Sequence, residues 1–238
     1  MARRTVREEI DALESAGTLT TEQASTLRTA PQWTVDANEL FAYLGGLIAS
    51  IGVTWLTVAL AIRKDPTIVK HIKRCVVMGA VADHIGNVTP VAEFNMWVDP
   101  EAVDVVLRSG MKLEFVGWDI SRFDACIRPE ESARIRAIGT PLAHFAIDIQ
   151  RAVAEFCATE TKVPGFDLPD PIAMAYAIDS SIAISTRELY LEAVTSDGPA
   201  RGMVVMDTLG VTHREPNALV VTKGDHERFM AMLAAAVS

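Results

Sequence analysis

A polar loop near the middle of the chain holds residue types that could do chemistry. Asn87, Glu93 and Asn95 bring two amides and a carboxylate into a stretch that also contains Phe94. Amides donate and accept hydrogen bonds and a carboxylate accepts them, which suits a polyhydroxylated ligand such as a sugar. The alternative is a turn-rich loop whose polar side chains bond to their own backbone. Residue types alone leave both interpretations open.

The elements around this loop suggest how it is positioned. It follows an apolar run, Cys75–Met78, and it ends where Asp99 can cap a helix that Pro100 opens. Two further Asp-Pro pairs begin at Asp65 and Asp170, and each can start a capped helix in the same way. Capping alone therefore accounts for Asp170.

From residue 47 onward, short apolar runs alternate with helical patterns, which predicts an α/β fold with a mostly parallel sheet flanked by helices. The predicted strands are Leu47–Ile51, Cys75–Met78, Leu113–Val116, Met203–Met206 and Leu219–Val221. The predicted helices are 55–63, 66–72, 101–109, 130–157, 171–179 and 225–236. Ligands bind beyond the carboxyl ends of the strands in such sheets, so we expect the 79–98 loop at that edge.

Two segments near the N-terminus need separate treatment. Residues 1–40 are charged and helical in pattern, and we expect a helical extension there, followed by an α/β domain over 41–238. The 22 residues from 41 to 62 carry no charge, which is long enough to span a bilayer. Their glycines and threonines instead favour a strand, a turn and a helix buried in protein. Membrane insertion is the alternative.

Composition narrows the classes of partner. The 238 residues include 22 basic and 31 acidic side chains, for a net charge of −9. An acidic chain is poorly suited to nucleic acid or to an anionic membrane surface, so small molecules and protein partners fit better. Cys75, Cys126 and Cys157 are odd in number and form no CxxC pair. They indicate a reducing, cytoplasmic location without a disulfide framework.

The ungapped run from Gly86 to Ala102, GNVTPVAEFNMWVDPEA, closely resembles the central motif of the inosine/uridine-preferring nucleoside hydrolases. Segments on either side agree with that family in order: 60–66, 76–79, 167–173, 201–203 and 216–218. The resemblance covers roughly residues 47–238. It implies a nucleoside-hydrolase-like fold, N-terminally incomplete, and the family's reaction, hydrolysis of the N-glycosidic bond of ribonucleosides to base and ribose.

The resemblance also implies roles for individual residues. Asn87, Glu93 and Asn95 would form hydrogen bonds to the ribose hydroxyls. Met78 and Phe94 would line the ribose pocket. In the family, a bound calcium ion coordinates the ribose hydroxyls and a water. Here Asp170 and the Ile51 carbonyl would be oxygen ligands of that calcium ion. His84 and His144 are candidates for the acid that protonates the leaving base. The segment Trp118–Ser121 corresponds to a structural strand end.

The sequence departs from the family in ways that affect catalysis. The family's aspartate-rich loop supplies the general base and most calcium carboxylates, but residues 1–40 contain only Asp11 and Asp36, outside that pattern. Pro169 stands where the family commonly has a histidine, and the turn at 52–57 also deviates. We therefore expect impaired hydrolysis by this chain alone. Three functions stay open: an enzyme completed by another chain or acting as a homo-oligomer, a non-catalytic nucleoside- or ribose-binding remnant, and a membrane-associated fusion.

Overall fold

The computed structural model describes residues 11, 14–16, 20–21, 24–25, 54–161 and 163–238. The chain divides into two units, Met1–Leu47 and Ile48–Ser238. Within the first unit, the described residues are helical at positions 11, 14–15, 21 and 24–25. The predicted strand Leu47–Ile51, including the proposed calcium ligand Ile51, lies outside the described residues.

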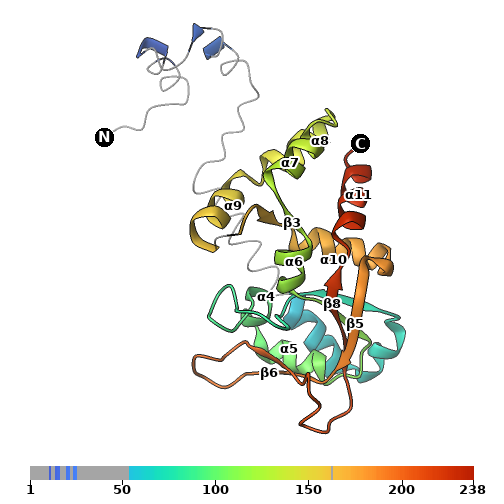
Figure 1. Ribbon diagram of the computed structural model, residues 1–238. Helices are drawn as coiled ribbons and strands as arrows, with labels where there is room; N and C mark the ends of the chain where they lie inside the picture. The colour runs from blue at the N-terminus through green and yellow to red at the C-terminus, as the bar shows by residue number, and fades with distance from the viewer. Residues whose placement is uncertain (1–10, 12–13, 17–19, 22–23, 26–53, 162) are drawn as a thin grey trace. The chain divides into compact units, whose positions relative to one another are not determined.

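The second unit is built on a four-stranded sheet in the order β1-β2-β8-β5 (Figure 1). Strands β1 (Cys75–Met78), β2 (Leu113–Val116) and β8 (Ala218–Gly224) are parallel. The fourth strand, β5 (Ala183–Leu189), runs antiparallel to β8. The predicted α/β fold with a mostly parallel sheet is thus confirmed. Valine-rich runs form β1 and β8 because strands covered on both faces need apolar side chains on both.

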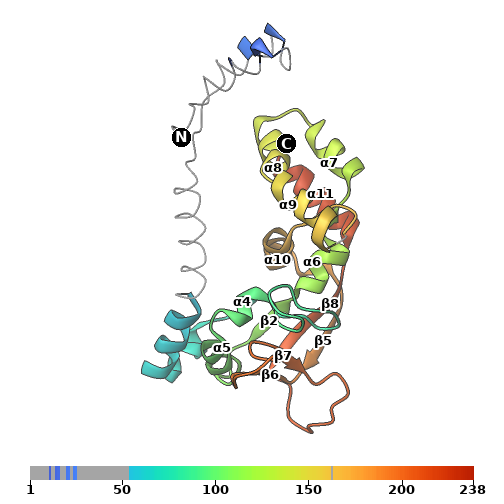
Figure 2. The same ribbon diagram turned by 90° about the vertical axis from the view of Figure 1, so that its left-hand side faces the viewer.

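Helices and two short antiparallel ribbons surround this sheet (Figures 1 and 2). The helical elements are residues 54–64, η1 (Pro66–His71), α4 (Phe94–Trp97), α5 (Pro100–Leu107), α6 (Trp118–Asp124), α7 (Pro129–Arg136), α8 (Pro141–Asp148), α9 (Arg151–Phe156), η2 (Cys157–Thr161), α10 (Pro169–Ile178), η3 (Ser180–Ile182) and α11 (His226–Ala236). The ribbons pair β3 (Cys126–Ile127) with β4 (Phe166–Asp167), and β6 (Leu191–Ala193) with β7 (Val204–Met206).

The sheet has a hydrophobic core on each face. Neighbouring residues of β8 belong to different cores. Val220 packs in the core that α5 covers, and Val221 packs in the core that α6, α10 and α11 cover. Phe115 and Val116 of β2 divide in the same way. This follows from the alternation of side chains along a strand. The two layers are visible in Figure 2, where α5 and α10 lie on opposite sides of the sheet.

Two predicted elements differ in the structure. The predicted helix 130–157 is divided into α7, α8 and α9, because Gly139 adopts a positive φ of 80° and Thr140 then caps a new helix. The Thr140 Oγ1 accepts a hydrogen bond from the Ala143 N–H over 3.0 Å. The segment Trp118–Ser121, expected to end a strand, instead opens helix α6 after the N-cap residue Gly117. The expectation of a strand end there was wrong.

The uncharged segment 41–62 is described only from residue 54. There it forms a helix with Ala59 and Ile62 buried, whereas Leu56 and Leu60 are 47% and 52% exposed. The expected burial in protein is met on one face of this helix. Among the described residues, no helix combines the length and the apolar character needed to cross a membrane.

Candidate functional site

The candidate site begins with a strained turn at the carboxyl end of β1. The Gly79 N–H donates to the Val116 carbonyl over 3.2 Å, which ties the turn to the end of β2. Ala80 then adopts a φ of +64°, a left-handed conformation that costs a residue with a Cβ about 1–2 kcal/mol. Such strain persists only where surrounding contacts hold the backbone in place.

Glu93 is the most buried polar group of the site, with 3% of its surface exposed. It caps α4: its Oε1 accepts from the Asn95 N–H over 3.0 Å, and its Oε2 accepts from the Met96 N–H over 3.4 Å. The same Oε2 accepts from the Ala80 N–H over 3.2 Å, so Glu93 also holds the strained turn. Burial raises the pKa of Glu93, although these backbone hydrogen bonds and one from the Asn87 side chain oppose the rise.

The two asparagines anchor the loop from either side of Glu93. The Asn87 Oδ1 accepts from the Phe94 N–H over 2.8 Å. The Asn95 Nδ2 donates to both the carbonyl oxygen and the sulfur of Met78, each over 3.2 Å. The structure therefore brings four of the predicted pocket residues into one hydrogen-bond network, and the half-buried Phe94 follows Glu93 directly in α4.

This network satisfies much of its own polar capacity. A carboxylate offers about four acceptor sites. Three backbone N–H groups and the Asn87 side chain already donate to Glu93. Among the described residues, the Asn95 Oδ1 accepts no hydrogen bond. The interpretation of the loop as bonded to its own backbone is thus correct for Asn87 and Glu93, whereas the Asn95 Oδ1 remains an unoccupied acceptor within the described part of the chain.

Asp170 lies in the first turn of α10, and the direction of that helix brings its start toward the same edge of the sheet. Arg74, next to the beginning of β1, donates to the carbonyls of Ala177 and Tyr176 at the end of α10, over 2.8 and 3.3 Å. Since the end of α10 lies at the start of β1 and the two elements pack together, α10 runs opposite to β1.

The capping interpretation of Asp170 was wrong. Leu168 is the N-cap of α10 and makes no side-chain cap, whereas Asp65 and Asp99 do cap their helices. Asp170 is exposed, and among the described residues its carboxylate has no hydrogen bond or ion pair. Capping therefore does not explain its presence.

The residues that the structure describes do not supply a calcium site. No group of three or more His, Cys, Asp or Glu side chains among them is arranged to hold a metal ion. Calcium takes six to eight oxygens. Asp170 alone is far short of that number, and Ile51 lies outside the described residues.

A second buried carboxylate, which the sequence analysis did not select, lies beside the turn. Asp119 is 8% exposed, and its Oδ1 accepts from the Ala82 N–H over 3.4 Å. Burial raises the pKa of Asp119. Its position directly after strand β2 is the signal that could have identified it.

The two candidate acids predicted from the sequence lie on different elements. The His84 ring stacks on Phe123 of α6 at 5.1 Å between ring centroids. Among the described residues, no hydrogen bond, ion pair or ring contact links the other candidate acid, His144 of α8, to the loop.

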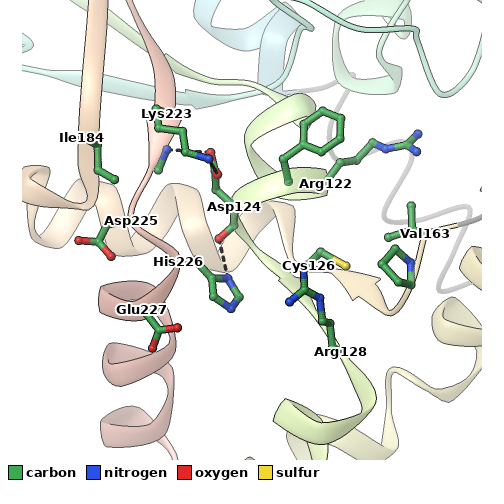
Figure 3. A pocket seen from close by; sticks show the side chains of 13 residues that line it. Arg122, Asp124, Cys126, Arg128, Val163, Ile184, Lys223, Asp225, His226 and Glu227 are labelled. Atoms are coloured by element: carbon green, nitrogen blue, oxygen red, sulfur yellow. Dashed lines mark hydrogen bonds and ion pairs between the residues drawn. The ribbon is translucent and has the colours of Figure 1, made fainter.

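A separate cavity of about 540 Å³ lies where α6, β8 and α11 meet (Figure 3). His226 forms part of its wall: Nδ1 lies 3.1 Å from the Asp124 carbonyl and Nε2 lies 2.7 Å from the Glu131 carboxylate. Burial lowers the pKa of this imidazole, but both partners are acceptors, so these contacts favour the doubly protonated ring and, with nearby negative charges, raise its pKa overall. Lys223 pairs with the Asp124 carboxylate, as Figure 3 shows. None of the predicted site residues lines this cavity.

The mostly parallel sheet thus carries the Asn87–Glu93–Asn95 loop at its carboxyl edge. The chain belongs to the inosine-uridine preferring nucleoside hydrolase family, whose model matches residues 50–231. It is 34% identical over 178 residues to the pyrimidine-specific ribonucleoside hydrolases RihA of Escherichia fergusonii and Shigella flexneri, which covers 74% of this chain and 56% of those proteins.

Solved structures agree on the fold. A purine-preferring ribonucleoside hydrolase from Gardnerella vaginalis is 25% identical, with a TM-score of 0.65 over 76% of this chain and 58% of that one. A nucleoside hydrolase from Bacillus anthracis is 22% identical, with a TM-score of 0.60 over 74% of this chain and 56% of that one. The chain therefore spans little more than half the length of the relatives that it matches.

Proposed function

We propose that this chain binds the ribose of ribonucleosides at the carboxyl edge of its sheet. The observation that carries this proposal is the hydrogen-bond network of Met78, Asn87, Glu93 and Asn95, a cluster of polar groups fixed in position by backbone contacts. The free Asn95 Oδ1 suits a hydroxyl donor, and Phe94 would provide an apolar wall. The relatives' names support a ribonucleoside as the ligand.

We further propose that this chain alone hydrolyses nucleosides very slowly or not at all. The sequence contains no aspartate-rich loop to activate a water, and Pro169 offers no proton to the leaving base. Loss of general-base assistance alone costs about 10²–10⁴ in rate. Ribose contacts can persist without catalysis, because binding the ground state does not lower the chemical barrier.

A complementing chain would restore what is missing. Calcium at Asp170 and Ile51 would require further oxygens, which a second polypeptide with an aspartate-rich loop could supply. On this proposal calcium adds little to nucleoside binding by this chain alone. A cytoplasmic location stays a prediction from the three cysteines, which form no disulfide with one another.

Calorimetric titration of the full chain with inosine, uridine and ribose, with and without calcium, tests the proposal. We expect weak binding that Asn95→Ala abolishes and that calcium hardly changes, with no base released over hours. Asn217→Ala is the matched control, because Asn217 makes a similar network with Leu107 and Leu191 away from the site. Turnover of inosine or uridine at ordinary enzymatic rates would refute the proposal that hydrolysis is impaired. Absence of binding would refute the proposal of a ribose site.

A further inference from the structure

Two buried carboxylates hold the strained 79–82 turn, one on each side. Glu93 accepts from the Ala80 N–H, and Asp119 accepts from the Ala82 N–H. We propose that Asp119 is a positioning residue, which together with Glu93 fixes this turn and so places the loop that carries Asn87. This inference rests on the proposed ribose site and adds to it a residue that makes no direct contact with the sugar.

The junction between β2 and α6 is built around the Asp119 carboxylate. A Cβ on Gly117 would lie 2.2 Å from the Asp119 Oδ1, so a larger residue would displace this carboxylate. The Trp118 N–H donates to the Ala80 carbonyl over 3.0 Å. The turn is therefore fixed at four points: the N–H of Gly79, the N–H and the carbonyl of Ala80, and the N–H of Ala82.

Fixing this turn matters because its backbone is unfavourable by itself. Ala80 has a positive φ of 64°, which its Cβ makes unfavourable, and it precedes the loop residues 83–93 without an intervening element. A turn freed at Ala82 could relax toward ordinary φ values and carry Asn87 away from Glu93. Met78 and Asn95 would keep their contact, because it lies before the turn and within α4.

Asp119 also has a structural role that the test must separate. Its carboxylate interacts with the backbone N–H groups of its own residue and Ile120, at the start of α6. Removing it therefore costs some helix stability whatever it does for the turn. The two roles are separated by the rate of hydrogen–deuterium exchange in the turn itself.

The experiment compares Asp119→Ala with Asp124→Ala in the full chain. Asp124 belongs to the same helix and is 4% exposed, but its carboxylate binds Lys223 and the Gly224 N–H instead of the turn. Hydrogen–deuterium exchange is read by mass spectrometry on peptides covering 79–92 and 218–226, and ribose affinity by calorimetry. Asp119→Ala should speed exchange in 79–92 and weaken ribose binding, each by about tenfold, the loss expected for one hydrogen bond to a charged group.

Asp124→Ala should speed exchange in 218–226 only and leave ribose affinity unchanged. Asp119→Asn, which keeps an acceptor oxygen, should restore part of the protection, and Gly117→Ala, which displaces the carboxylate without removing it, should reproduce the loosening. Unchanged exchange in 79–92 for both Asp119→Ala and Gly117→Ala would overturn the inference. If the unaltered chain binds no ribose, the proposed function fails, while the exchange rates still decide whether Asp119 fixes the turn.

Discussion

Replacing Glu93 by alanine tests how far the site depends on one buried carboxylate. The side chain is 3% exposed and joins three backbone N–H groups, those of Ala80, Asn95 and Met96. Alanine cannot accept any of these hydrogen bonds. The α4 helix then loses its cap, and the strained turn at Ala80 loses one of its attachments.

The expected cost follows from those contacts. Loss of a capping side chain costs about 1 kcal/mol, and a buried N–H left without a partner costs about 1–3 kcal/mol. For Glu93→Ala the sum is about 3 kcal/mol, since part of the loop can relax or admit water. In a unit of this size each kcal/mol lowers the melting temperature by roughly 2–4 °C, so the expected fall is about 6–12 °C.

Thermal unfolding followed by circular dichroism measures this effect. The control is Glu101→Ala, because Glu101 is also a glutamate in this region but is 53% exposed in its ion pair with Arg201. Exposed ion pairs contribute little, so the control should melt within about 2 °C of the unaltered chain. A melting temperature for Glu93→Ala equal to that of the control would refute the role of Glu93 as a structural anchor of the site.

Two further predictions concern charged groups outside the loop. Burial lowers the pKa of His226, but its hydrogen bonds to Glu131 and to the Asp124 carbonyl, with the nearby glutamate charges, together outweigh this and raise the pKa above 6.5. Burial raises the pKa of Glu131, but its hydrogen bonds and nearby positive charges together lower the pKa below 4.5. Because the pKa of His226 is raised on folding, the histidine stabilises the fold fully below pH about 6.5 and loses that contribution as the pH rises through its folded pKa. Because the pKa of Glu131 is lowered on folding, the carboxylate stabilises the fold above pH about 4.5 and loses that contribution as the pH falls through its folded pKa. His226→Gln should therefore lower the melting temperature most between pH about 4.5 and 6.5, and progressively less as the pH rises through the folded pKa of His226. An effect independent of pH would contradict the charged pair. Arg74→Lys should lose most of the stability that Arg74→Ala loses in urea unfolding, because lysine cannot reproduce the forked contacts of 2.7 and 2.9 Å to Glu114; a lysine variant as stable as the unaltered chain would contradict this.

The sequence predicted the central parallel strands better than the edge strand β5 and the helix α6. Apolar runs identified β1, β2 and β8 because strands buried on both faces contain few polar residues. Strand β5 was missed, since most of its side chains are exposed and its pairing with β8 is a tertiary contact. The start of α6 was missed because Gly117 caps it without any side-chain signal.

The site shows the same division between residue identity and geometry. The motif from Gly86 to Ala102 identified the polar residues, and the structure brings Asn87, Glu93 and Asn95 together with Met78. What the sequence could not predict is which atoms are already occupied, because that depends on backbone N–H groups of the turn and of α4. The role of Asp119 could not be predicted for a similar reason, since its partner Ala82 is distant in sequence.

The two interpretations of the loop that the sequence left open turn out to be compatible. Glu93 and Asn87 are bonded chiefly to backbone and to each other, so they hold the site in shape. Asn95 is held through its amide nitrogen, which leaves its oxygen in a fixed direction for a hydroxyl. For the proposed ribose site, this organisation lowers the entropic cost of binding, because the groups are already ordered before the ligand arrives. Such order gives affinity for the ground state, and catalysis requires further groups that bind the transition state more tightly.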